Sequence, residues 1–288
     1  MKTLVRTLSR RDFLKVSASA FTVLTASGVA GMIPEPPPSD IPIGVQLYCV
    51  RNKLKNDFPR TLAALAKMDY QGVEFADYFG HSARDLRRML DGNGLQCCGS
   101  HIYFDDLVGE NLKETIAFNR TLGNKYLILR WMPEEHRSSE EEFLKTIDFL
   151  NEVAAKVEPH GMRLGYHNHD YIFETFDGEM LWNILADRSR ENFILQMDTG
   201  NAAHTGVDVI PLLERNAGKT ATIHMKPFSS KDDNALIGED ELDWKRILQI
   251  CEHSGATEWY IIEYEREAYD SLEALELNLD NFRQLQAS

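Results

Sequence analysis

The feature that most constrains the fold is a repeated alternation of short apolar runs with longer segments of helical period, from residue 41 onward. Apolar runs of about four to eight residues are typical of buried strands, and apolar residues on one face of a helical repeat are typical of helices. The expected strands are residues 43–47, 72–75, 97–101, 126–130, 163–167, 193–198, 222–224 and 259–263. The expected helices are residues 57–68, 82–91, 112–122, 139–158, 180–185, 209–216, 243–254 and 271–286, the second with Ser82 as its N-cap.

Strand and helix alternate eight times, which predicts a parallel sheet because each helix returns the chain to the same edge. Eight such units in roughly 250 residues predict a single α/β domain, a (β/α)8 TIM barrel over residues 41–288. A doubly wound open sheet is the alternative. It is disfavoured because no glycine-rich dinucleotide fingerprint follows the first strand, and the sequence has neither a phosphate-binding loop nor an internal repeat.

The first thirty residues differ in character from the rest of the chain. The pair Arg10 and Arg11 precedes a mildly apolar stretch over residues 16–29, a pattern typical of a twin-arginine export signal. The stretch is shorter than the roughly 20 residues that span a bilayer, and residues 28–30 have small side chains suited to cleavage. We therefore expect residues 1–30 to be a signal peptide whose removal leaves no stable membrane anchor. An uncleaved anchor or a chance arginine pair is the alternative to a periplasmic or exported protein.

A proline-rich stretch within residues 31–40 is typical of an extended linker, so the fold is expected to begin near residue 41. The chain carries a formal net charge of −14. Residues 1–30 contribute +4, so their removal leaves −18. Such an acidic body repels phosphate backbones and anionic membrane surfaces. Nucleic acid is therefore not an expected partner, and a neutral small molecule is.

The four cysteines have no spacing typical of a metal site. They are Cys49, Cys97, Cys98 and Cys251. Cys97 and Cys98 are adjacent within an expected strand, where successive side chains point to opposite faces. We expect four buried thiols, although an oxidising compartment would permit a disulfide.

Metal-binding side chains stand at the carboxyl ends of the last four expected strands. They are His167, Asp198, His224 and Glu263. In a parallel barrel these ends meet on the face that carries the active site. Buried polar groups need partners, so four in succession indicate one shared site rather than four separate structural residues. Two imidazoles and two carboxylates suit one divalent ion, Mn, Co, Zn or Fe, better than Mg or Ca, which prefer oxygen ligands alone.

Other strand ends carry candidates for catalysis or substrate binding. Glu74 ends the second strand and His101 the third, and both point into the barrel mouth if the period of two holds. A core histidine satisfied by hydrogen bonds is the alternative for His101. Arg130 and Trp131 end the fourth strand, where a guanidinium suits sugar hydroxyls or a carboxylate and an indole ring suits a sugar face.

These residues together resemble the sugar phosphate isomerase/epimerase superfamily of xylose isomerase-like TIM barrels, over residues 41–286. The motifs that carry the resemblance are Val73-Glu74, Ser100-His101, His167-Asn168-His169, Met197-Asp198-Thr199-Gly200-Asn201, Ile223-His224-Met225-Lys226 and Ile262-Glu263. The resemblance implies that a glutamate, an aspartate, a histidine and a glutamate from strands five to eight bind one divalent metal. In this sequence those positions are His167, Asp198, His224 and Glu263. It also implies that the two glutamates act as acid and base on opposite faces of a sugar.

The fifth strand departs from the pattern of this superfamily, because His167 stands in place of the first glutamate. A neutral imidazole in place of a carboxylate makes the metal a stronger Lewis acid, and it weakens a mechanism with two glutamates. Inosose dehydratases and lyases acting on 3-keto-glycosides look similar in having a histidine-rich fifth strand. Proton abstraction beside a carbonyl followed by elimination is then as consistent with the sequence as isomerisation.

We therefore expect a metal-dependent isomerase or epimerase that acts on a non-phosphorylated sugar. A lyase or dehydratase is the alternative, and a non-catalytic sugar-binding barrel is another. Glu263 or His169 would act as the base, and Lys226 would hold an oxyanion or a carboxylate. The residues assigned to catalysis are Glu263, His169, His101 and Glu74, and those assigned to substrate are Lys226, Arg130, Trp131 and Asn168. Barrels of this kind commonly pair, so a homodimer is also expected.

Overall fold

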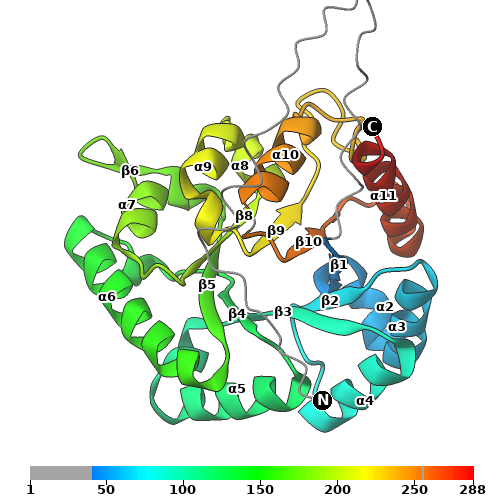
Figure 1. Ribbon diagram of the computed structural model, residues 1–288, viewed down its shortest axis with the longest axis horizontal. Coiled ribbons are helices and arrows are strands. Elements are labelled where there is room, and N and C mark those ends of the chain that lie inside the picture. Colours follow the sequence, from blue (N-terminus) through cyan, green and yellow to red (C-terminus); the bar gives the residue numbers. More distant parts are fainter. Residues whose placement is uncertain (1–40, 255) are drawn as a thin grey trace, which may run out of the picture. The chain divides into compact units, whose positions relative to one another are not determined.

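Eight parallel strands close into a barrel. The computed structural model describes residues 41–254 and 256–288, and the strands of this part follow one another in the order β1, β10, β9, β8, β5, β4, β3, β2 (Figure 1). They are β1 (Ile43–Gln46), β2 (Gly72–Phe75), β3 (Gln96–Ile102), β4 (Tyr126–Leu129), β5 (Arg163–His167), β8 (Ile194–Asp198), β9 (Thr222–Met225) and β10 (Trp259–Ile262). The predicted (β/α)8 barrel is confirmed, and all eight predicted strands are present.

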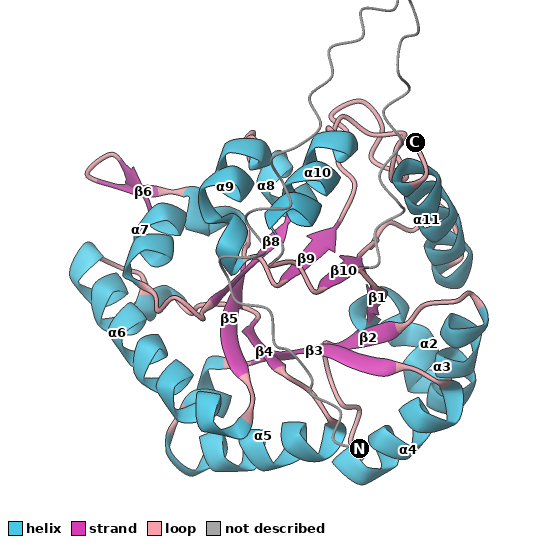
Figure 2. Cartoon of the chain, in the orientation of Figure 1, coloured by secondary structure: helices cyan, strands magenta, loops and turns pink. Residues whose placement is uncertain are grey.

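Helices surround the barrel (Figure 2). They are α2 (Arg51–Asn56), α3 (Phe58–Lys67), α4 (Ala83–Asn93), α5 (Gly109–Leu122), α6 (Glu140–Val157), α7 (Leu181–Arg188), α8 (Thr199–His204), α9 (Val209–Asn216), α10 (Trp244–Ser254) and α11 (Ser271–Gln286). The predicted N-cap is confirmed, because Ser82 Oγ accepts a hydrogen bond from Asp85 N at 3.2 Å. In the described part of the chain, the helices lack the combination of length and apolarity needed to cross a bilayer.

Besides short 3-10 helices, two α-helices and one hairpin were not predicted, and these lie in connections at the carboxyl ends of strands. They are α2, α8 and the small hairpin of β6 (Thr175–Phe176) and β7 (Glu179–Met180). Helix α8 has little apolar period to reveal it. It begins directly after Asp198, whose Oδ1 accepts a hydrogen bond from Asn201 N at 2.7 Å. A residue predicted as a metal ligand is therefore also the N-cap of a helix.

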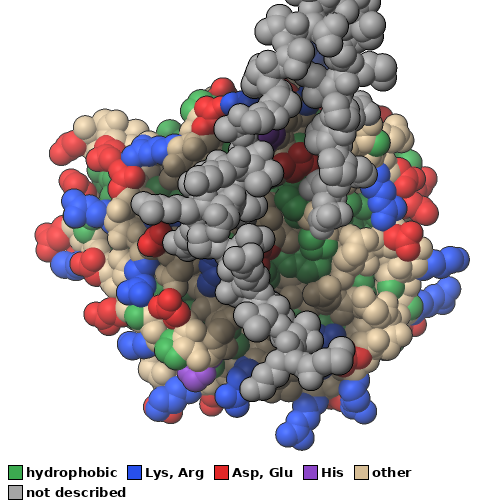
Figure 3. Space-filling view, viewed as in Figure 1, with side chains coloured by type: hydrophobic (Ala, Val, Ile, Leu, Met, Phe, Trp, Pro, Cys, Tyr) green, Lys and Arg blue, Asp and Glu red, His purple; other side chains and the backbone are tan. Residues whose placement is uncertain are grey.

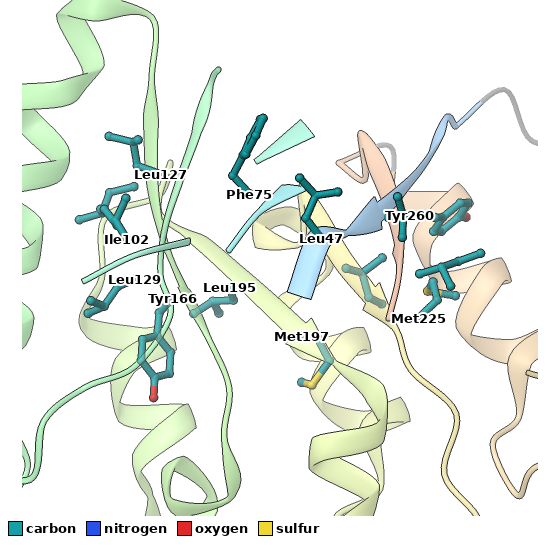
Figure 4. Close-up of a cluster of buried hydrophobic side chains, with 14 of the residues drawn as sticks. Leu47, Phe75, Ile102, Leu127, Leu129, Tyr166, Leu195, Met197, Met225 and Tyr260 are labelled. Atoms are coloured by element: carbon teal, nitrogen blue, oxygen red, sulfur yellow. The ribbon is translucent and has the colours of Figure 1, made fainter. Parts of the chain in front are cut away.

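Apolar side chains form two separate layers, because successive strand residues point to opposite sides of the sheet. Those pointing outward pack against the helices, among them Leu127, Leu129, Tyr166 and Met197 (Figure 4). Those pointing inward fill the barrel: Cys98, Tyr126, Ile128, Ile194, Ala221, Trp259 and Ile261. All four cysteines are buried and free, as predicted.

Glycines let the strands accommodate the bulky inward side chains. A Cβ on Gly72 would collide with the indole of Trp259, and one on Gly165 would collide with Ile128 and Ile194. The strands' lower, amino-end part is thus a packed apolar core rather than a pore. On the visible outer surface, acidic and basic side chains are interspersed around the rim (Figure 3).

The expected signal peptide, residues 1–30, and the expected linker, residues 31–40, lie outside the described residues. Export therefore stays a prediction from the sequence.

Candidate active site

Polar side chains replace apolar ones in the carboxyl-end part of the barrel, and they form one connected network. Its members are Gln46, Glu74, His101, His167, Gln196, Asp198, Thr222, His224 and Glu263. Apart from His101, which keeps slight exposure, all of these side chains are buried. Buried polar groups require partners, and the contacts among these residues supply most of them.

Glu74 lies at the base of this network and is fully buried. Its carboxylate accepts hydrogen bonds from Gln46 Nε2 at 2.8 Å, Gln196 Nε2 at 2.8 Å and His224 Nε2 at 2.5 Å. The neighbouring Gly99 makes room for it, because a Cβ there would collide with Glu74 Oε1. Burial alone would raise the pKa of Glu74, but the nearby imidazoles outweigh burial and lower it. Glu74 is therefore an ionised group beneath the cavity and does not line it.

Gln196 sets the protonation of two imidazoles. Its Nε2 donates to Glu74 Oε1 and to Thr222 Oγ1, so its Oε1 faces the other way. That oxygen lies 3.0 Å from His101 Nε2 and 3.0 Å from His167 Nδ1. A carbonyl oxygen only accepts, so both imidazole nitrogens must carry the proton. Burial, with smaller effects from nearby imidazoles, lowers the pKa of His167 well below its usual value, so its Nε2 carries a lone pair.

The carboxylate of Asp198 has one satisfied oxygen and one that lacks a hydrogen bond. The backbone N–H of Asp198 donates to Asn168 Oδ1 at 2.6 Å, and the carboxylate oxygen Oδ1 of Asp198 accepts from Asn201 N. The buried Oδ2 has no hydrogen-bond partner. It lies 3.9 Å from His167 Nε2 and 3.8 Å from His224 Nδ1. Lys226 Nζ lies 3.8 Å from the same oxygen. Burial raises the pKa of Asp198 to about 7 although Lys226 opposes this, so a cation in direct contact with Oδ2 would further stabilise the charged form.

His224 lies between two carboxylates. Its Nε2 donates to Glu74, and its Nδ1 lies 2.7 Å from Glu263 Oε2. Burial lowers the pKa of His224, but the two carboxylates outweigh burial and raise it to about 10. The other oxygen of Glu263 accepts from Lys226 Nζ at 2.9 Å. Both oxygens of Glu263 are therefore occupied, by an imidazolium and an ammonium.

These donor atoms fit a divalent metal ion. Asp198, His224 and Glu263 offer ligand atoms within 4.8 Å of one another, and so do His101, His167 and His224. The two sets share His224, so the four predicted ligands are brought together as two overlapping groups. The unpartnered Asp198 Oδ2 and the lone pair on His167 Nε2 are the features that a cation would satisfy. Loss of the Nδ1 proton would free His224 as a further nitrogen donor.

A cavity with about 560 Å³ of empty space opens above the network and is lined by His101, Arg130, His167, His169, Lys226 and Glu263 among others. The buried Nδ1 of His169 has no hydrogen bond. Burial lowers the pKa of His169 to about 4, so the ring is neutral at neutral pH. A neutral imidazole in a cavity wall can accept a proton from a bound molecule.

The predicted substrate residues divide into two groups. Arg130 and Lys226 line the cavity, and Arg130 Nη1 donates to Tyr103 Oη at 3.0 Å. Asn168 is buried and holds Asp198 through both of its amide atoms. Trp131 is 52% exposed and does not line the cavity.

Three further network residues were not predicted from the sequence. Gln46 and Gln196 donate hydrogen bonds to Glu74, and Thr222 Oγ1 accepts one from Gln196 Nε2 at 2.9 Å. A signal was present for Gln196, which is two residues before Asp198 on one strand and so shares its face. Gln46 likewise ends the first strand on its inward side.

Comparison with known proteins agrees with the fold. Residues 62–285 match the family described as xylose isomerase-like TIM barrel. The chain belongs to this family. Among curated relatives, an inosose dehydratase of Geobacillus kaustophilus is 27% identical over 66% of this chain and 68% of its own length. An inosose dehydratase of Clostridium beijerinckii is 21% identical over 74% of this chain and 84% of its own length.

Solved structures share the fold of this chain at low identity. A sugar phosphate isomerase/epimerase from Parabacteroides distasonis superposes with a TM-score of 0.72, at 19% identity, over 87% of this chain and 97% of that one. The IOLI protein, crystallised with a binding zinc atom, gives a TM-score of 0.67 at 17% identity, over 85% of this chain and 98% of that one. These likenesses concern the barrel itself.

Proposed function

We propose that this protein is a divalent-metal-dependent enzyme that removes a proton beside the carbonyl of a non-phosphorylated sugar or sugar-like polyol. The observation that carries the proposal is the buried Asp198 Oδ2, which has no hydrogen bond and lies near His167 Nε2 and His224 Nδ1. His167, Asp198, His224 and Glu263 are the proposed ligands. The donor set of two imidazoles and two carboxylates favours Mn, Co, Zn or Fe.

A bound divalent ion would stabilise the negative charge that develops on the sugar oxygen, by several kcal/mol. The proton must go to a group on the protein. Glu263 is engaged by His224 and Lys226 through both oxygens, whereas His169 lines the cavity with a neutral ring whose Nδ1 has no hydrogen bond. We assign His169 as the proton acceptor, and Glu263 as a ligand. The sequence leaves Glu263 and His169 as alternative bases, and we propose His169.

Hydroxyl groups of the sugar would be placed by His101, Arg130 and Lys226, which line the cavity. His101 donates through Nε2, so its Nδ1 is left to accept from a hydroxyl. Glu74 supports these groups from beneath and does not touch the substrate in this account.

Two outcomes are compatible with removal of that proton. Its return at another carbon or face gives isomerisation or epimerisation. Loss of hydroxide from the next carbon, with a proton, gives elimination of water. We favour elimination, because both curated relatives described above are named inosose dehydratase and because His167 weakens a mechanism with two glutamates. A barrel that binds sugar without turnover is the remaining alternative.

Hydrogen exchange in D2O tests the step that both outcomes share. The purified protein is loaded with Mn, Co, Zn or Fe and given ketoses, keto-inositols and 3-keto-glycosides, with and without a chelator, and proton NMR follows the C–H beside each carbonyl. We expect loss of that signal on at least one compound, and suppression by chelator. A metal-loaded protein that exchanges and converts none of them would contradict the proposal.

Substitution of the proposed base separates catalysis from metal binding. His169→Gln should reduce exchange by about 10²- to 10⁴-fold, because a positioned base contributes on that order, while metal content stays unchanged. The matched control is His160→Gln, an exposed histidine in the connection before β5. Equal loss in both variants, or loss of metal from His169→Gln, would remove His169 from this role.

We also propose export through the twin-arginine route, supported by Arg10 and Arg11 ahead of the short apolar stretch. Replacing both by lysine should retain the protein in the cytoplasm of a bacterial host that has this pathway. Cell fractionation measures the result, and unchanged export of the double variant would contradict the proposal.

A further inference from the structure

A second cavity lies beside the one described above, with about 810 Å³ of empty space, part of it open to solvent. Its lining comes from the connections after β5, β8, β9 and β10, and includes Asp170, His204, Phe228, Asp232, Tyr264 and Arg266. Neither the mechanism proposed above nor the strand-end motifs use these residues.

The two cavities share a ridge of three residues, Asn201, Lys226 and Glu265. Lys226 Nζ binds both others, at 3.1 Å from Asn201 Oδ1 and 2.7 Å from Glu265 Oε2. Lys226 also donates to the proposed ligand Glu263. A molecule that crosses this ridge therefore occupies the reacting cavity on one side and the second cavity on the other.

The outer wall is the long connection between β9 and α10, residues 226–243. Connections of this length are uncommon in compact domains and usually serve function. Asp240 holds it in place, because its Oδ2 accepts from Phe228 N at 3.1 Å and its Oδ1 from Trp244 Nε1 at 2.6 Å. Tyr264 Oη adds a bond to Asn234 O at 2.8 Å. The half-buried ring of Phe228 is thus fixed in the wall.

The lining combines an apolar ring with an excess of carboxylates. Phe228 packs its ring edgewise against His204, with centroids 6.0 Å apart. Four acidic residues, Asp170, Asp232, Asp233 and Glu265, face two basic ones, Lys226 and Arg266. Carboxylates accept hydrogen bonds from hydroxyls and repel phosphates, and aromatic rings stack on the apolar face of a sugar. This chemistry suits an uncharged, polyhydroxylated ring.

We infer that the second cavity is a subsite for a second sugar ring, so that the substrate is a neutral glycoside rather than a single sugar. The reacting ring lies in the cavity above His167 and Asp198, and the linked ring lies against Phe228. This inference rests on the proposed function, because it deepens the substrate class of the same site.

Binding of non-reacting sugars tests the subsite without any turnover. Isothermal titration of the full chain, kept in chelator, compares glucose with the disaccharides maltose, cellobiose and trehalose. We expect at least one disaccharide to bind about tenfold more tightly than glucose. Phe228→Ala should reduce the affinity for that disaccharide about three- to tenfold, the range expected for one aromatic contact, and leave glucose unchanged. Phe228→Tyr, which keeps the ring, should bind as the unmodified protein does.

The matched control is Tyr269→Ala, because Tyr269 is an exposed aromatic residue that lines neither cavity. It should leave both affinities unchanged. Equal affinities for glucose and all three disaccharides would overturn the inference, and so would equal weakening of glucose and disaccharide by Phe228→Ala. Tighter binding of trehalose 6-phosphate than of trehalose would overturn the inference that the ligand is uncharged. The titration measures binding and not turnover. A failure of the proposed chemistry would therefore not change these results, and the two failures can be told apart.

Discussion

The amino-end and carboxyl-end halves of the barrel interior are built from the same strands and differ in what their inward residues require. The amino-end half is filled by residues such as Ile128, Ile194 and Trp259, which satisfy one another by packing. The carboxyl-end half contains ionised and hydrogen-bonding groups, and one of them, Asp198 Oδ2, has no hydrogen bond. One half stabilises the fold, and the other, in our proposal, is completed by a bound metal ion. The predictions below test that division.

The largest effect should follow from removing the charge of Asp198. Asp198→Asn keeps the shape of the side chain but removes a proposed ligand charge, so we expect loss of tight metal binding and a fall in turnover of about 10³-fold. The metal-free variant should differ little from the metal-free parent in stability to urea, because the lost attraction to Lys226 Nζ, 3.8 Å away, offsets the relief of removing a buried charge. A variant that unfolds readily would show instead that Asp198 serves the fold.

A substitution in the amino-end half of the barrel should lower stability and leave metal binding unchanged. Ile128→Ala leaves a cavity in the packed interior, so the free energy of unfolding should fall by about 2–5 kcal/mol in urea titration. Metal stoichiometry of the folded variant should not change. Loss of metal at temperatures where this variant is still folded would show that the two halves are coupled, contrary to the division above.

A smaller effect is expected at the contact between the halves. Gln196→Met removes the acceptor shared by His101 and His167, which fixes the proton on His167 Nδ1. Partners of this kind affect metal affinity by about 10- to 100-fold, so competition with a chelator should reveal a loss of that size. The control is Leu195→Met, the outward neighbour on β8, which should keep the parent affinity. Equal affinities in both variants would mean that Gln196 only fills space.

Much of this arrangement follows from the sequence, because both the barrel and the strand-end residues depend on local periodicity. All eight strands were predicted, and so was the convergence of His167, Asp198, His224 and Glu263. The protonation of the imidazoles could not be predicted, because it depends on how the amide of Gln196 on β8 is oriented toward His101 on β3 and His167 on β5.

The position of Glu74 could not be predicted from the sequence either. The register of β2 against β3 shifts between Val73 and Glu74, and Gly99 leaves the space into which the carboxylate turns. Alternation along one strand predicts that Glu74 faces inward, but not that it lies beneath the cavity.

The most direct test of the central claim is anomalous X-ray diffraction from crystals of the protein soaked in zinc. Our account predicts one anomalous peak within coordination distance of Asp198 Oδ2 and His224 Nδ1, at about 2.0–2.2 Å from each. A peak only at the protein surface, or none at a zinc concentration that saturates binding in solution, would contradict the account and leave the carboxyl-end half as a hydrogen-bonded network without a metal.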